Sequence, residues 1–164
     1  GLKLRIAPVY RDFFQKLGAQ VVQVAPGEVY TALERGVVDG YGWPLIGIFD
    51  LGWQERTKYR IEPGFYSLEV GVVFNANSLK RLTPQQRQFL DRQAAWLESL
   101  NADIAKKDAP AEAKRQQDAK IEVIRLDDAQ AKLFVKTAND TAWNALVTAS
   151  PTHGPKLREL LAPK

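Results

Sequence analysis

The stretch from Pro26 to Leu45 (PGEVYTALERGVVDGYGWPL) limits the possible fold more than any other part of this sequence. Three apolar residues near its start are spaced as one face of a helix requires: Val29, Tyr30 and Leu33. Gly36 then suits the left-handed position that ends helices. Val37-Val38 is long enough for one buried strand, and Asp39-Gly40 marks a turn after it. The pattern predicts a helix, a break, a very short strand and an aromatic turn.

The residues before this stretch alternate between strand and helix patterns. Residues 2–6 alternate apolar and basic side chains, with the two-residue period of a strand covered on one face. Pro8 opens a helix that Gly18 ends, and residues 19–24 predict a second strand. The apolar face of that helix comprises Val9, Phe13, Phe14 and Leu17. The order strand, helix, strand, helix, strand predicts parallel βαβ units with right-handed crossovers, and therefore an α/β fold.

The middle of the chain predicts one short helix and two further strands. Residues 44–54 are apolar with glycine interruptions, which favours a short helix. Residues 59–75 are rich in β-branched and aromatic side chains around a Pro63-Gly64 turn, which predicts a strand on each side of it. The second of these strands is expected from about Leu68 to Phe74.

A long helix is expected after Thr83, since Thr83 and Gln86 occupy the two positions of a capping box with Pro84 in the first turn. Its apolar residues recur on one side: Leu90, Leu97, Leu100 and Ile104. Pro110 is expected to end or kink this helix, because proline clashes with the carbonyl four residues back. The helical pattern resumes after it to about Asp118.

The last part of the chain predicts one strand and two helices. Residues 121–124 form a short apolar run, and Asp127 or Asp128 can cap the helix that follows. Pro151 and Gly154 break this helix, and a short helix closes the chain.

Composition excludes several classes of protein. The 164 residues allow one domain with a core, or parts of two smaller lobes. The net charge of +4 comes from basic and acidic residues that are interleaved along the chain, which disfavours nucleic-acid binding. No apolar run is long enough to cross a membrane, and zero cysteines exclude disulfides and thiolate sites. The chain opens at Gly1 on a strand pattern without a leader, so we expect a processed or excised piece.

The sequence offers little catalytic chemistry. The one histidine, His153, lies in a Pro/Gly turn far along the chain from any acidic cluster, where a surface position is the simpler interpretation. No motif recruits a nucleophile, zinc or phosphate. Asp127-Asp128 precedes a helix, and capping accounts for it. We therefore predict a protein that is not an enzyme, with no catalytic residue, no cofactor and no metal site.

Arg5 is the first candidate for ligand binding because of its place in the predicted fold. It lies near the carboxyl end of the first strand, and in open α/β sheets ligands bind outside that edge. A guanidinium offers a rigid fork of donors that holds a carboxylate by two parallel hydrogen bonds. The alternative is a surface arginine in a weak ion pair.

Trp43 is the second candidate, in the aromatic turn Gly40-Tyr41-Gly42-Trp43-Pro44. Flanking glycines let the backbone pass close to another group, and an indole offers an apolar wall with one N–H donor. A plain core tryptophan is the alternative, and core packing is the default for Trp53, Trp96 and Trp143. Phe65 and Tyr66 follow a Pro-Gly turn and are weaker candidates for lining a cleft.

The chain resembles the DctP-type solute-binding proteins of TRAP transporters. The resemblance rests on Gly1-Leu2-Lys3-Leu4-Arg5, on Gly36-Val37-Val38-Asp39-Gly40 and on Pro44-Leu45, in the family's order. In that family a strand of this pattern ends in an arginine that pairs with the ligand carboxylate, which implies that role for Arg5. We predict Tyr41, Gly42 and Trp43 of the aromatic turn as ligand-binding residues together with Arg5, and Trp43 stands where many members of the family carry asparagine.

The resemblance covers only the C-terminal half of such a protein and implies part of a two-lobe periplasmic-binding fold. Residues 1–43 form a βαβαβ segment of the second lobe with the ligand-facing edge. Residues 44–82 cross to the first lobe and contribute strands to it. Residues 83–120 form the long connecting helix, and residues 121–164 return to the second lobe with the C-terminal helices. Such a piece exposes apolar surface, which favours a homodimer or a missing N-terminal half.

The implied function is that of a periplasmic subunit that captures a small organic anion, such as a dicarboxylate or a 2-oxo acid, for the TRAP membrane subunits. One alternative is a ligand-sensing domain of the same fold in a signalling protein. Another is a helical protein-interaction module, which a helix-dominated structure without strands would support.

Overall fold

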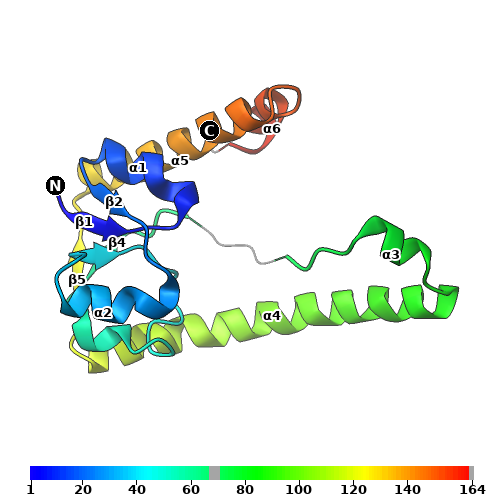
Figure 1. Ribbon diagram of the computed structural model, residues 1–164, viewed down its shortest axis with the longest axis horizontal. Coiled ribbons are helices and arrows are strands. Elements are labelled where there is room, and N and C mark those ends of the chain that lie inside the picture. Colours follow the sequence, from blue (N-terminus) through cyan, green and yellow to red (C-terminus); the bar gives the residue numbers. More distant parts are fainter. Residues whose placement is uncertain (67–70, 163–164) are drawn as a thin grey trace. The chain divides into compact units, whose positions relative to one another are not determined.

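A computed structural model describes residues 1–66 and 71–162 (Figure 1). The chain divides into two compact units, which we describe separately. The first combines Gly1–Ser67 with Gln116–Lys164, and the second is Leu68–Arg115.

The first unit is built on the predicted parallel sheet. Its strands are β1 (Lys3–Arg5), β2 (Gln20–Val22) and β3 (Gly40–Tyr41), in the order β2-β1-β3 with both pairings parallel. The crossovers are two short helical segments, namely η1 (Pro8–Tyr10) with α1 (Arg11–Lys16), and η2 (Pro26–Glu28) with α2 (Val29–Glu34). The α/β fold with parallel βαβ units is therefore confirmed.

The end of α2 corrects the prediction of a strand at Val37-Val38. Gly36 adopts the expected left-handed conformation, with φ 67°. The N–H of Val37 donates to the Ala32 carbonyl at 2.9 Å, and the N–H of Gly36 donates to the Leu33 carbonyl at 3.2 Å, which is the Schellman pattern. The two valines therefore belong to the helix end. The Asp39 N–H donates to the Lys3 carbonyl of β1 at 2.7 Å, and the paired register with β1 begins at Gly40.

Burial around β1 also differs from the simple alternation that residues 2–6 predict. Leu2 is 62% exposed, whereas Arg5 and Ile6 are both buried. Phe13 is buried as expected, but Val9 is 75% exposed. Val9 lies in the 3₁₀ segment η1, whose tighter winding gives it a different phase from the apolar stripe of α1.

The core of the first unit forms around Trp53. It comprises Val29, Ile48, Trp53 and Ile121, with Tyr41 and Trp43 among the partly buried side chains packed against it. The short helix expected in residues 44–54 is wrong. Gly47 and Gly52 have φ of 106° and 70°, so the chain makes turns there, and only the 3₁₀ segment η3 (Trp53–Arg56) follows.

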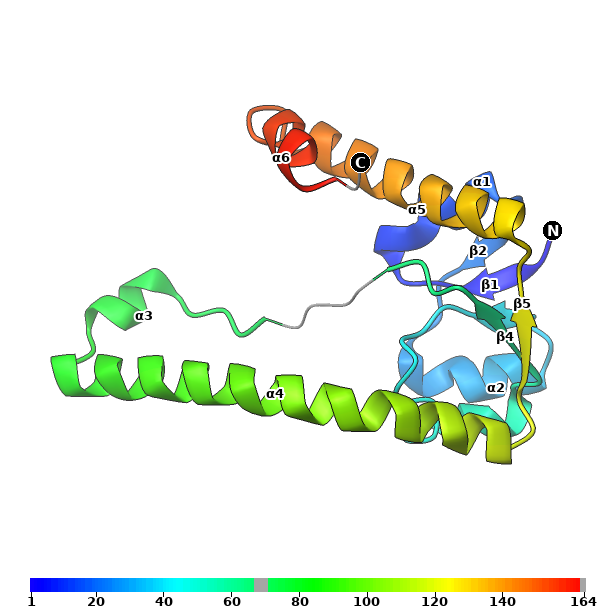
Figure 2. The same cartoon turned by 180° about the vertical axis from the view of Figure 1, so that it is seen from behind.

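A second, two-stranded sheet joins distant parts of the sequence. Strands β4 (Tyr59–Glu62) and β5 (Glu122–Arg125) pair in parallel and lie side by side in Figures 1 and 2. Helix α5 (Asp128–Ala149) follows, and the Asp127 carboxylate caps it by accepting the Gln130 N–H at 2.8 Å. Helix α6 (Gly154–Leu161) closes the chain as predicted.

The strand predicted from Leu68 to Phe74 is wrong where it can be compared. Residues 67–70 lie outside the described part, and residues 71–74 adopt no strand. Val72 and Val73 are 71% and 92% exposed. A strand needs a neighbour to satisfy its backbone groups, and none pairs with these residues in the described part of the chain.

The second unit contains α3 (Ala76–Lys80) and most of α4 (Pro84–Asp118). The predicted capping box is confirmed, since the Gln86 N–H donates to Thr83 Oγ1 at 3.2 Å and the Thr83 N–H donates to Gln86 Oε1 at 2.9 Å. Pro110 lies inside α4 and does not end it. Proline removes one backbone donor, and the hydrogen bonds of a 35-residue helix on either side of it persist.

Candidate site at the carboxyl edge of the parallel sheet

Arg5 is a buried cation at the end of the central strand. Only 8% of its surface is exposed, and in the register of the sheet it lies between Val22 of β2 and Tyr41 of β3. Its Nε donates to the Val24 carbonyl at 3.0 Å, and its guanidinium carbon lies 5.3 Å from the centroid of the Trp43 ring. The sheet and the indole thus hold the guanidinium on two sides.

The charge of Arg5 has no counter-charge in the described part of the chain. No carboxylate there forms an ion pair with it, and its two terminal nitrogens make no hydrogen bond to the described residues. Burial lowers the pKa of Arg5 from its ordinary value, but a guanidinium stays charged in proteins. The two terminal nitrogens are not among the fully buried unsatisfied atoms of the described residues, so they are open to an end-on carboxylate.

Gly42 lets the aromatic turn run close to β1. Its N–H donates to the Arg5 carbonyl at 2.9 Å, one residue beyond the end of β3. A Cβ at this position would lie 3.0 Å from Cδ1 of the buried Ile6, closer than nearly all real contacts of this kind. A side chain at this position would push the Ile6 side chain aside, so glycine allows the turn its close approach to Ile6.

Tyr41 packs against Trp53 of the core, and its hydroxyl is not a free donor. Its hydroxyl lies 2.6 Å from Thr57 Oγ1, and the Thr57 hydroxyl donates to the Trp53 carbonyl at 2.8 Å. The single proton of Thr57 is thus used, so the Tyr41 O–H is the donor between the two hydroxyls. Burial raises the pKa of Tyr41, which keeps the phenol neutral.

Trp43 lies between Arg5 and the core. Its ring meets the ring of Trp53 edge to face, with centroids 4.8 Å apart at 65°. Gly47 approaches the indole nitrogen so closely that a Cβ there would lie 3.3 Å from it. The fold brings Arg5, Gly42 and Trp43 together at one edge of the sheet, whereas the hydroxyl of Tyr41 faces Thr57. Their roles in ligand binding stay predictions.

Aromatic residues that come after β1 and β4 in the chain form a cluster. The sequence predicted only Phe65 and Tyr66 of this cluster as candidates for lining a cleft. The rings of Tyr10 and Tyr66 lie 4.3 Å apart, and Phe65 contacts both tyrosines as well as Phe13 and Phe134. Burial and the neighbouring Tyr10 raise the pKa of Tyr66 to about 12, so its phenol is neutral at pH 7. Tyr10 was missed, and its signal was an aromatic residue soon after the carboxyl end of a predicted strand.

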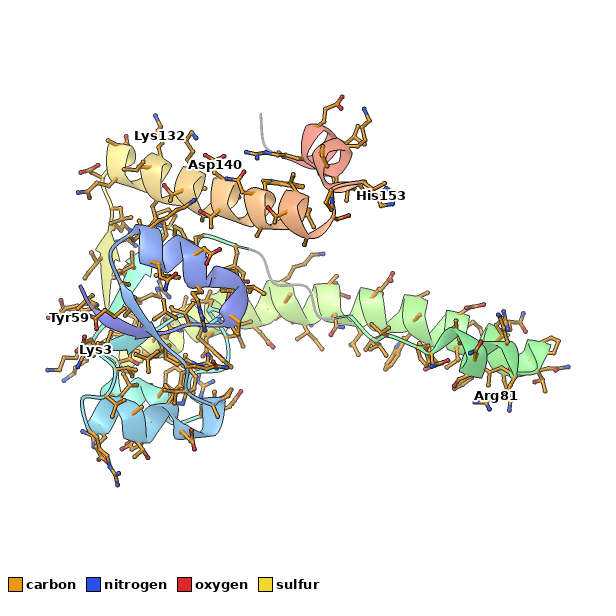
Figure 3. The ribbon with its side chains drawn as sticks, turned by 45° about the horizontal axis from the view of Figure 1, so that its top comes forward. Lys3, Tyr59, Arg81, Lys132, Asp140 and His153 are labelled. Carbon is orange, nitrogen blue, oxygen red and sulfur yellow. The ribbon has the colours of Figure 1, made fainter. Side chains whose placement is uncertain are left out.

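The last candidate residue is the histidine. His153 is exposed at the bend between α5 and α6, apart from Lys3 on β1 (Figure 3). The described residues contain no cluster of three or more acidic, histidine or cysteine side chains that could hold a metal ion. In the same part of the chain, no helix combines the length and apolar character needed to cross a bilayer.

The model of the family "Bacterial extracellular solute-binding protein, family 7" (DctP) matches residues 1–148. The chain belongs to this family. Among curated proteins it is 46% identical over 61 residues to protein y4mM of Sinorhizobium fredii, covering 36% of this chain and 11% of that protein. It is 30% identical over 93 residues to the monocarboxylate 2-oxoacid-binding periplasmic protein all3028 of Nostoc sp., covering 54% of this chain and 25% of that protein.

Solved structures of TRAP periplasmic solute-binding proteins share the fold. The protein from Desulfovibrio salexigens with bound orotic acid matches with a TM-score of 0.78 at 21% identity, over 98% of this chain and 52% of that one. The protein from Rhodoferax ferrireducens with bound malonate matches with a TM-score of 0.73 at 22% identity, over 99% and 55%. The periplasmic-binding fold is thus confirmed, and the chain spans about half the length of these structures.

Proposed function

We propose that the full protein containing this chain captures a small organic carboxylate in the periplasm and delivers it to TRAP membrane subunits. Arg5 binds the carboxylate, Trp43 forms a flat wall beside it, and Gly42 gives the turn its close approach. Tyr41 supports that wall through Trp53 and Thr57. The family is a class of solute-binding proteins for transport, not a class of enzymes, and no metal or cofactor enters the proposal.

The observation that carries this proposal is the buried, unpaired guanidinium of Arg5 beside an indole face. A cation that is 8% exposed and has no counter-charge in the described chain favours an anion supplied from outside it. The names of similar proteins are consistent with this chemistry, since they mention 2-oxoacids, orotic acid and malonate. The aromatic wall favours a planar acid, such as a 2-oxo acid or an aromatic carboxylate, over a sugar acid.

The lobe assignment is part of the same proposal. Residues 1–43 and 121–164 belong to the second lobe, residues 44–82 cross to the first, and residues 83–120 connect the two. In a two-lobe protein the carboxyl edge of β1 faces the cleft, which is where an anion meets Arg5. The exposed Val72 and Val73 are consistent with a strand that the N-terminal half, or a second copy, completes.

The test is to purify the full-length protein without added ligand, denature it and weigh the small molecules released by mass spectrometry. We expect a carboxylate of low mass at up to one equivalent. A neutral or cationic molecule at that stoichiometry would contradict the anion assignment. Genes for TRAP membrane subunits beside this one favour transport, whereas a neighbouring kinase or cyclase gene favours the sensing role.

A further inference from the structure

Gln116 makes a hydrogen bond to the chain just after Trp43, on the side of the turn away from the Gly42 bond to β1. Gln116 is only 4% exposed, and its Nε2 donates to the Leu45 carbonyl at 2.8 Å. Within the described part of the chain, this is the one hydrogen bond that any of residues 43–47 makes. Gly42 ties the near side of the turn to β1, and Pro44 has no N–H to contribute, so on the far side of Trp43 the polar attachment is the acceptor at Leu45.

The other end of the Gln116 amide is fixed by sheet residues. Its Oε1 accepts from Arg60 Nη1 at 2.9 Å, while Arg60 Nη2 lies 2.5 Å from Glu62 Oε1. Arg60 and Glu62 are two residues apart on β4, and therefore on the same face of the strand. Both polar ends of the Gln116 amide are thus satisfied, and its orientation is determined, with oxygen toward Arg60 and nitrogen toward Leu45.

The backbone of Gln116 is held at the end of α4. Its carbonyl accepts the Ile121 N–H at 3.0 Å, and Ile121 is a buried member of the core around Trp53. Lys120 adopts the left-handed conformation that this helix end requires, with φ 62°. The backbone hydrogen bond at the helix end and the two side-chain hydrogen bonds therefore each restrict the position of the Gln116 amide.

From these contacts we propose that Gln116 is a positioning residue for the ligand wall. By holding the Leu45 carbonyl, it fixes where Trp43 stands relative to Arg5, and so it tunes which carboxylates the site prefers. Gln116 touches neither Arg5 nor the bound anion in this proposal. The preference for ligands rests on the proposed function, whereas the position of Trp43 does not.

The decisive variant is Gln116→Glu in the full-length protein. Glutamate keeps an acceptor for Arg60 but loses the donor to Leu45 and sets a carboxylate oxygen against that carbonyl. Gln117→Glu is the matched control, because it makes the same charge change at the next residue, which is exposed. Gln116→Met tests the loss of both bonds without a charge and serves if Gln116→Glu fails to fold.

The first measurement needs no ligand. The indole N–H resonance of Trp43, assigned through its loss in Trp43→Phe, should shift in Gln116→Glu and Gln116→Met and stay unchanged in Gln117→Glu. The resonance of Trp143 on α5 serves as the internal reference. An unshifted Trp43 resonance in the folded Gln116 variants would overturn the proposal.

The second measurement is the ratio of calorimetric affinities for benzoate and malonate, used as planar and non-planar probes. We expect Gln116→Glu to change this ratio by about three- to tenfold, or about 0.6–1.4 kcal/mol. An unchanged ratio would overturn the role in selectivity. Arg5→Ala separates the proposed carboxylate site from the positioning role of Gln116. If Arg5→Ala binds both probes like wild type, the proposed site is wrong, and the Trp43 resonance still tests whether Gln116 positions Trp43.

Discussion

Two arginines of the first unit, one in each of its two parallel sheets, differ in their partners. Arg60 of β4 donates to Gln116 and pairs with Glu62, and its side chain is 23% exposed. Arg5 of β1 is 8% exposed, yet among the described residues it donates only to the Val24 carbonyl. The more deeply buried arginine is thus the one without a carboxylate. Because burying an unpaired charge costs stability, this contrast distinguishes an arginine kept for structure from one kept for a ligand.

The largest expected effect concerns Arg5. In the full-length protein, Arg5→Ala should weaken binding of the native carboxylate by about thirty- to several-thousand-fold, or about 2–5 kcal/mol, because the bound anion then lies unpaired. Arg5→Lys should recover only part of this loss, since an ammonium lacks the planar fork. Isothermal titration calorimetry at one salt concentration measures both.

The stability of the ligand-free protein is the companion measurement for Arg5→Ala. It should change little, because the substitution removes one hydrogen bond and one uncompensated buried charge together. Binding of Arg5→Ala within about twofold of wild type, less than one RT, would show that the contrast between the two arginines has no functional meaning.

Arg60 should show the opposite balance. Arg60→Ala should lower the free energy of unfolding by about 1–3 kcal/mol, since Glu62 and the buried Gln116 both lose a charged donor. Urea denaturation with an unchanged slope measures this.

Arg125→Ala is the matched control for Arg60. Arg125 reaches the same Glu62 at 3.4 Å, but its side chain is 74% exposed, so we expect a loss below about 1 kcal/mol. Equal losses of unfolding free energy in the two variants would show that the deeper burial of Arg60 adds nothing to its stabilising effect.

Local sequence patterns predicted the helix ends and the βαβ order, because each depends on neighbouring residues. The capping box at Thr83 and the cap at Asp127 are examples, and the glycine end of α2 is another. The position of β3 was missed, since Val37 and Val38 fit a strand pattern equally well until the Schellman bonds are known.

The difference between Arg5 and Arg60 could not be predicted from the sequence in the same way. Both lie in short strands where charged residues alternate with uncharged ones. The partner that distinguishes Arg60 is Gln116, 56 residues away. The place of Arg5 at the carboxyl edge followed from the topology, but its lack of a counter-charge required the packed structure. Gln116 lies in a polar stretch of α4 and gives no signal before the packing is known.

A smaller effect is expected at Trp43, which touches Arg5 through its ring face. Trp43→Ala should weaken binding of benzoate by about tenfold or less, or about 1 kcal/mol, since it removes an apolar wall and a cation–π contact but leaves the charge pair. Binding of malonate should suffer less than binding of benzoate, because a wall residue selects by shape. Calorimetry with both probes measures the two losses, and equal losses would contradict this role.

The smallest expected effect is on the free energy of unfolding, at the end of α4 where Gln116 contacts Arg60. Helices α2 and α4 end alike, but the left-handed residue is Gly36 in one and Lys120 in the other. A side chain there costs about 1–2 kcal/mol, and glycine returns about 0.5–1 kcal/mol of that through the freedom of the unfolded chain. Lys120→Gly should therefore raise the free energy of unfolding by up to about 1 kcal/mol, while carboxylate affinity stays unchanged. Lys120→Ala is the control, because it removes the same long side chain but keeps the strained Cβ. If urea denaturation finds the two variants equally stable, the strain at Lys120 is negligible, and stability in the Arg60 region must be assigned to the side-chain contacts alone.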